Sequence, residues 1–175
     1  MVGDYPQRRP ICRKADIMAV EIERRFLVRR DIRPLCRNGQ SIVQGYLPSD
    51  DGRTVRVRVA GPEATLTVKG PRHGLCREEV EHALPLDLAL GLLRHSCRGG
   101  LIEKTRYLIQ HHGLCWEVDV FGGENAGLVI AEVELSHADQ LVPLPDWVGA
   151  EVTHRAAYSN SALSLSPIRR WVGAA

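Results

Sequence analysis

Residues 54–69 read TVRVRVAGPEATLTVK, and this stretch decides the fold that we expect for the chain. Apolar and polar residues alternate on both sides of Gly61-Pro62, a dipeptide that is typical of turns. Because side chains in a β-strand point alternately to its two faces, each half is predicted to be a strand with one apolar and one polar face. A turn at this dipeptide would place Arg56 opposite Thr67 in an antiparallel hairpin. In the same way, a two-residue turn at His112-Gly113 would place Arg106 opposite Asp119.

The same period of two residues recurs along most of the chain. It predicts strands at 20–29, 41–47, 54–60, 64–69, 77–83, 101–111, 114–121 and 129–135. Pro85 opens a helical stretch, LDLALGLLRH, in which leucines recur at helical spacing. Beyond residue 135, prolines interrupt a region of short helix and loop. We therefore expect a mainly β (α+β) fold, a closed antiparallel β-barrel of about eight strands with flanking helices.

Charged residues on these strands stand in pairs of like sign, two residues apart and therefore on one face. The pairs are Glu21 and Glu23, Arg56 and Arg58, Glu79 and Glu81, Lys104 and Arg106, Glu117 and Asp119, and Glu132 and Glu134. A solvated surface tends to mix signs, because neighbouring like charges repel each other. The segregation therefore indicates two selected surfaces, one for cations and one for anions.

Two interpretations of this charged face are possible. In the first, an ordinary sheet packs its apolar face on a core and leaves its charged face in water, where cross-strand ion pairs add only ~0.2–1 kcal/mol each. In the second, a barrel packs its apolar faces outward and its charged faces line a water-filled tunnel. Dry burial of so many charges would be prohibitive, but bound polyanions and divalent cations would balance them. The tunnel also explains why the pairs are segregated by sign.

Composition limits the classes of function. The 175 residues fit one domain, and a net charge of +2 is too small to indicate nucleic acid or membrane as a partner. Five cysteines without metal-ligand spacing favour free thiols in a reducing compartment, and no apolar run approaches the ~20 residues that span a bilayer. We expect a cytoplasmic protein, a monomer or homodimer, with a flexible arm at 1–17 and a folded domain at 18–170.

The run at 21–28, EIERRFLV, resembles the E-x-E-x-K opening strand of the CYTH domain, the triphosphate tunnel metalloenzyme family. Further segments are similar to later motifs of that family, in the same order, so that the resemblance covers about residues 18–166. These segments are QGYL at 44–47, RVR at 56–58, LTVK at 66–69, REEVE at 77–81, EKTRY at 103–107, WEVDVF at 116–121, EVE at 132–134, EVT at 151–153 and YSN at 158–160.

The resemblance implies a barrel tunnel that binds triphosphate-bearing substrates together with Mg²⁺ or Mn²⁺. Carried over by motif, the metal ligands would be Glu21, Glu23, Glu132 and Glu134. The phosphate-binding residues would be Arg25, Arg56, Arg58, Lys69, Arg77, Lys104 and Arg106, and the catalytic residues Arg25, Glu23 and Glu134. The remaining acids, Glu79, Glu81, Glu117 and Asp119, would act through water or balance the bases.

Three functions follow from such a tunnel. The first is a metal-dependent hydrolase of inorganic triphosphate or another small phosphorylated substrate, such as a nucleotide or thiamine triphosphate. The second is an adenylate cyclase that converts ATP to cyclic AMP, and the third is a module that binds polyphosphate without turnover. Two departures from the family bear on this choice.

The first departure is Arg25, which stands where the family usually has lysine. Arginine keeps the charge but does not readily release a proton, so activity is reduced if that lysine orients or deprotonates the nucleophile. The second departure is the segment HRAA at 154–157, where the family tends to carry an acidic and a basic residue. This segment is expected to close one side of the tunnel.

Overall fold

The computed structural model describes residues 19–50, 52–73 and 76–173, and the side chains of 19–21, 72–73, 76–77 and 172–173 are outside the description. The predicted arm at 1–17 lies outside the described residues. The described elements, in chain order, are β1 (Ala19–Val28), η1 (Arg33–Leu35), β2 (Gln40–Leu47), β3 (Thr54–Ala60), β4 (Glu63–His73), β5 (Cys76–Ala83), α1 (Leu86–His95), β6 (Arg98–His111), β7 (Leu114–Phe121), η2 (Gly123–Asn125), β8 (Val129–Glu134), β9 (Val148–Glu151), η3 (Ala156–Tyr158), α2 (Asn160–Leu165) and η4 (Ile168–Gly173). In this part of the chain, no helix is long and apolar enough to cross a membrane.

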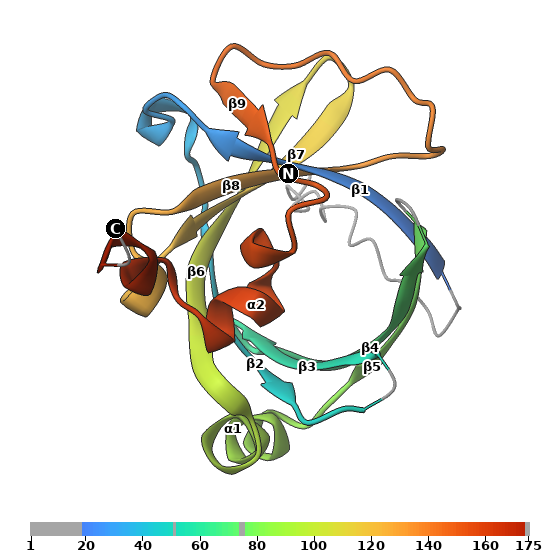
Figure 1. Ribbon diagram of the computed structural model, residues 1–175, viewed down its shortest axis with the longest axis vertical. Coiled ribbons are helices and arrows are strands. Elements are labelled where there is room, and N and C mark those ends of the chain that lie inside the picture. The colour runs from blue at the N-terminus through green and yellow to red at the C-terminus, as the bar shows by residue number, and fades with distance from the viewer. Residues whose placement is uncertain (1–18, 51, 74–75, 174–175) are drawn as a thin grey trace, which may run out of the picture.

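The nine strands form one antiparallel sheet in the order β5-β4-β3-β2-β6-β7-β8-β1-β9. Strand β1 also pairs with β5, from Ala19 opposite Glu79 to Ile22 opposite Cys76, so the sheet curls round to meet itself. Figure 1 shows the resulting ring of strands viewed along the barrel. The prediction of an antiparallel barrel is confirmed. The short β9 was not predicted, and it extends the sheet outside the ring by pairing with the end of β1.

The two predicted hairpin registers are also confirmed. Arg56 lies opposite Thr67 across the β3–β4 turn, and Arg106 lies opposite Asp119 across the β6–β7 turn. At the β6–β7 turn, His112 and Gly113 have φ angles of 47° and 77°. Two consecutive positive φ values are typical of the tight two-residue turn that matches the twist of a hairpin. Each register brings charged side chains of neighbouring strands onto the same face.

The outer face of the barrel is apolar and is covered in two places. Helix α1 lies outside the ring (Figure 1), where its Ala89 and Leu93 pack on Val57 and Ala64 of β3 and β4. On the other side, a second core forms over β1, β6, β7 and β8. Its buried residues are Phe26, Ile32, Ile109, Trp116, Val118, Ala131, Val133, Leu135, Trp147 and Val148. Packing of apolar side chains outward leaves the opposite faces of the same strands for the barrel interior.

The barrel interior is apolar at one end, which the sequence pattern did not predict. Ile102, Phe121 and Ile130 lie on the same strand faces as the charged residues and form a cluster with Leu163 of α2. Helix α2 approaches the start of β6 so closely that a Cβ on Gly99 would lie 2.6 Å from the carbonyl oxygen of Ser164. Figure 1 shows α2 within the outline of the ring. The charged interior is therefore confined to the rest of the barrel.

Candidate active site

The charged interior faces of the strands surround a cavity of about 500 Å³. Eight of the residues predicted from the sequence to form the site line it, namely Glu23, Arg25, Arg56, Arg58, Lys69, Arg106, Glu132 and Glu134. A second cavity, of about 710 Å³, shares Arg58, Glu81, Arg106 and Glu117 with the first and continues toward the β3–β4 turn. The tunnel interpretation is confirmed, and the ordinary sheet with its charges on an outer surface is wrong.

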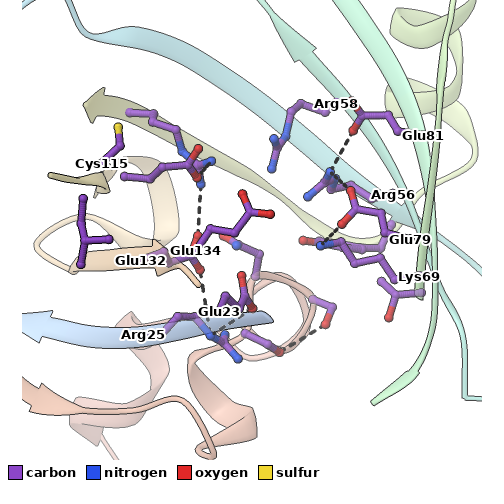
Figure 2. Close-up of a pocket in the computed structure, with 18 of the residues that line it drawn as sticks. Glu23, Arg25, Arg56, Arg58, Lys69, Glu79, Glu81, Cys115, Glu132 and Glu134 are labelled. Carbon is purple, nitrogen blue, oxygen red and sulfur yellow. Dashed lines mark hydrogen bonds and ion pairs between the residues drawn. The ribbon is translucent and has the colours of Figure 1, made fainter. Parts of the chain in front are cut away.

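One side of the cavity, which we call the basic wall, is formed by Arg56, Arg58 and Lys69 of β3 and β4 (Figure 2). Lys69 and Arg56 each contact an acidic side chain, which holds the base in place and partly neutralises its charge. Lys69 Nζ lies 2.8 Å from a Glu79 carboxylate oxygen. Arg56 donates to the Thr67 hydroxyl at 2.9 Å and reaches Glu81 at 3.4 Å. Because of these partners, the basic wall is held in place before any anion binds.

Arg58 is oriented by an uncharged residue that the sequence interpretation did not single out. Its Nε donates to Oε1 of Gln44 at 3.0 Å, and Nε2 of Gln44 donates to the Tyr46 hydroxyl at 2.7 Å. Gln44 is fully buried, with 0% of its surface exposed. Burial lowers the pKa of Arg58 to about 10 and raises that of Tyr46 to about 12, so the guanidinium stays charged and the phenol stays neutral at pH 7.

The opposite side, which we call the acidic wall, carries Glu23 of β1 and Glu132 and Glu134 of β8 (Figure 2). Glu23 lies directly opposite Glu134 in the antiparallel register, and Arg25 lies opposite Glu132. Directly opposed residues have Cβ atoms about 4.5–5.5 Å apart, so the two carboxylates of the first pair can share one cation. Among the described residues, no three His, Cys, Asp or Glu side chains already form a metal-binding group.

Arg106 joins the acidic wall to a buried ion pair behind it. Its Nε and Nη2 each donate to Asp119 at 2.7 Å, Nη1 donates to Glu117, and Nη2 reaches Glu132 at 3.3 Å. Lys104 Nζ donates to the same Asp119 at 2.5 Å. The Lys104 side chain is 0% exposed and the Asp119 side chain 1% exposed. Lys104 was expected to hold phosphate, but the structure places it behind the described cavity lining.

Burial and the neighbouring charges together determine the protonation of this pair. Burial lowers the pKa of Lys104 from 10.5 to about 8, although the charge of Asp119 opposes the shift. The pKa of Asp119 falls to about 2, because the attraction of Lys104 and Arg106 outweighs its burial. Asp119 therefore stays ionised and holds Arg106 toward the cavity.

Arg25 is 6% exposed and is held mainly by the main chain of the C-terminal segment. Its Nη2 donates to the carbonyl oxygen of Thr153 at 3.3 Å, and its Nη1 donates to that of Tyr158 at 3.4 Å. Its Nε lies 3.7 Å from Glu23 and 4.0 Å from Glu132, longer than a hydrogen bond. The guanidinium thus stands between the acidic wall and the segment at 153–158.

Two predicted site residues cannot be placed by their side chains. The backbone of Glu21 pairs with that of Arg77 between β1 and β5, but both side chains lie outside the description. The cavity lining also includes Ser159, Asn160 and Ser161, which the sequence interpretation did not assign to the site. The strand pattern could have revealed Gln44, because this polar residue lies on the same face of β2 as Tyr46. In the structure Gln44 lies opposite Arg58.

The charges around the cavity are nearly balanced. Five bases and six acids line it, which leaves a net charge of −1 among the described side chains. A polyanion such as triphosphate would not be attracted by that total, so bound cations are needed in addition to the bases. The acidic wall fits this requirement, because Mg²⁺ is typically held by one or two carboxylates together with substrate phosphates.

Comparisons with known proteins agree with this geometry. Residues 19–164 match the CYTH domain. The chain belongs to the CYTH domain family. An inorganic triphosphatase of Acetivibrio thermocellus is 42% identical over 154 residues, covering 88% of this chain and 99% of the relative. An inorganic triphosphatase of Nitrosomonas europaea is 36% identical over 155 residues, covering 83% and 97%.

Solved structures give the same result. A crystal structure of an inorganic triphosphatase superposes with a TM-score of 0.63 and 34% identity, covering 85% of this chain and 97% of that one. A protein of Pyrococcus horikoshii with 19% identity and a TM-score of 0.52, covering 68% and 81%, shares the fold. The curled sheet of this CYTH domain therefore recurs in solved proteins.

Proposed function

We propose that this CYTH domain is a metal-dependent hydrolase of triphosphate-bearing substrates, with inorganic triphosphate as its main substrate. The observation that carries the proposal is one cavity with a basic wall facing an acidic wall. The names of the two bacterial relatives, which this chain matches over more than four fifths of its length, favour the same substrate.

The basic wall would bind the phosphate chain. Arg56, Arg58 and Lys69 present charged donors from two adjacent strands, and Arg106 adds a fourth base from β6. Guanidinium groups bind phosphate through paired hydrogen bonds, whereas the Lys69 ammonium acts as a point charge. Because Glu79, Glu81, Glu117 and Asp119 contact these bases or Lys104, we assign those four acids to orienting and balancing them.

The acidic wall would hold the metal. We assign Glu23 and Glu134 as ligands and Glu132 as their neighbour, with Glu21 as a further ligand from the same strand. When bound there, Mg²⁺ or Mn²⁺ would supply positive charge to the phosphate oxygens and acidify nearby water. The chain itself would hold the terminal phosphoryl group between the two walls while water attacks phosphorus and the P–O–P bridge breaks. Such a reaction depends on positioning and charge neutralisation more than on covalent catalysis.

The test is to incubate the pure protein with Mg²⁺ or Mn²⁺ and triphosphate, ATP or thiamine triphosphate, while orthophosphate, pyrophosphate and cyclic AMP are followed. We expect one orthophosphate and one pyrophosphate from each triphosphate, only when metal is present. Cyclic AMP from ATP would instead indicate a cyclase, and binding without any product would indicate a polyphosphate-binding module; either result overturns the proposal. Glu78→Gln is the matched control for changes at the acidic wall, because Glu78 is an exposed neighbour of Glu79 on β5.

A further inference from the structure

Arg25 contacts both ends of the turn at residues 153–158. Its two terminal nitrogens donate to the carbonyl oxygens of Thr153 and Tyr158. These carbonyls flank the segment HRAA at 154–157. A planar guanidinium can reach two acceptors at once, whereas a single ammonium at the end of a lysine cannot reproduce that fork.

Neighbouring contacts fix the same segment to β1. The Arg25 amide donates to the Thr153 hydroxyl at 3.0 Å, and the Val152 amide donates to the Arg25 carbonyl at 2.8 Å. On the other face of the strand, Arg24 Nη2 lies 2.6 Å from Glu151. Arg24 therefore holds Glu151 at the end of β9 from outside the barrel, whereas Arg25 holds the following turn from within it.

The held segment leads directly into the cavity lining. After the turn, the Ser159 hydroxyl accepts from the Ala162 amide at 3.2 Å and so starts α2, and its Oγ lies 3.2 Å from that of Ser161. Ser159, Asn160 and Ser161 line the cavity, and Oδ1 of Asn160 is buried with no hydrogen-bond partner among the described residues. A buried acceptor without a partner is expected to face a ligand or ordered water.

We propose that Arg25 is a positioning residue that holds the turn at 153–158 and thereby sets where Ser159, Asn160 and Ser161 meet the bound triphosphate. The identity of the substrate in this inference rests on the proposed function, whereas the hold of Arg25 on the turn rests on its contacts alone. The inference assigns Arg25 to the shape of the substrate site and not to proton transfer.

The test compares Arg25→Lys with Arg24→Lys, the same substitution at the adjacent residue, which faces away from the cavity. Amide hydrogen exchange is measured for Arg155, Tyr158 and Ser159, whose N–H groups close the turn at 2.9–3.0 Å. We expect exchange at these amides to be about tenfold faster in Arg25→Lys and within twofold of the parent in Arg24→Lys. The KM for triphosphate should rise about tenfold in Arg25→Lys while kcat changes less than threefold.

Unchanged exchange together with a higher kcat in Arg25→Lys would overturn the inference, because Arg25 would then act at the reacting atoms. Unchanged exchange with unchanged kinetics would overturn it as well. If the parent protein does not hydrolyse triphosphate, the proposed function fails, but the exchange experiment still decides whether Arg25 holds the turn. Arg25→Met, which has no donors, provides the same exchange test if the lysine variant does not fold.

Discussion

Replacement of Asp119 by asparagine tests whether the buried ion pair behind the acidic wall organises the site. The substitution keeps the side-chain volume but removes the charge that faces Lys104 at 2.5 Å and Arg106 at 2.7 Å. Removal of one partner from a buried ion pair destabilises a protein by about 3–5 kcal/mol, because the other charge stays buried without a counter-ion. For a chain of this size, that loss corresponds to a fall in Tm of roughly 6–20 °C.

The destabilisation should depend on pH in a defined direction. Unfolded lysine keeps its proton up to 10.5, while folded Lys104 releases it near pH 8, so the unfolded state binds more protons and stability rises with pH between those values. Without the charge of Asp119, the pKa of folded Lys104 falls further. The stability of the Asp119→Asn variant therefore begins to rise at a lower pH than that of the parent. The deficit of Asp119→Asn relative to the parent should therefore be larger at pH 6 than at pH 9.

The assay is urea unfolding followed by circular dichroism at pH 6 and pH 9, for the parent, Asp119→Asn, Lys104→Met and the double variant. Lys104→Met alone should lower the free energy of unfolding less than Asp119→Asn does, because Asp119 keeps its two hydrogen bonds from Arg106. In the double variant no unpaired lysine remains, and a coupling energy of about 2 kcal/mol is expected. The reasoning would be refuted if Asp119→Asn lowered the free energy of unfolding at pH 6 by less than about 1 kcal/mol, or if the difference from the parent were not smaller at pH 9.

Three further predictions concern the cavity. Glu23→Gln and Glu134→Gln should each abolish metal-dependent turnover while the circular dichroism spectrum is retained, and unchanged activity at saturating Mg²⁺ would exclude them as ligands. Gln44→Leu removes the acceptor that orients Arg58, a loss of about 1–2 kcal/mol that should raise KM for triphosphate roughly tenfold; an unchanged KM would show that Arg58 needs no orientation. Partial burial and the nearby Glu117 raise the pKa of the exposed Cys115 thiol, so its alkylation should become faster as the pH rises. Bound triphosphate should suppress this alkylation if the substrate fills the cavity, whereas equal labelling with and without triphosphate would place the substrate elsewhere.

Much of the fold could be predicted because its decisive signals are local. Strand β3 has the predicted bounds, and its register with β4 is the predicted one. Both were predictable because Gly61 specifies the turn and the alternating valines specify the two faces. Strand β9 could not be predicted in this way. Its four residues, VGAE, carry no period, and they become a strand only because β1 offers a free edge to them.

The sequence predicted which residues of the site face the barrel interior, but not how far along the barrel each of them lies. Alternation places Ile102, Lys104 and Arg106 on one face of β6, and the structure agrees. The pattern gives no information on how far along the barrel each residue lies. Leu163 of α2 packs against Ile102, so Lys104 is enclosed and only Arg106 reaches the cavity. That outcome depends on a short helix some sixty residues later in the chain, which no local period can reveal.

The central place of β1 has a consequence for how the protein is made. This first strand pairs with β5, β8 and β9, and Arg25 contacts a residue 128 positions later in the chain. Contacts between such distant segments slow folding, and the ring cannot be completed until β8, which ends at Glu134, has left the ribosome. Until then its strands have unpaired edges, which are prone to aggregation. Charged residues on their inner faces keep the strands hydrated during that interval, so the charges that we propose for substrate binding would also protect the unfinished sheet.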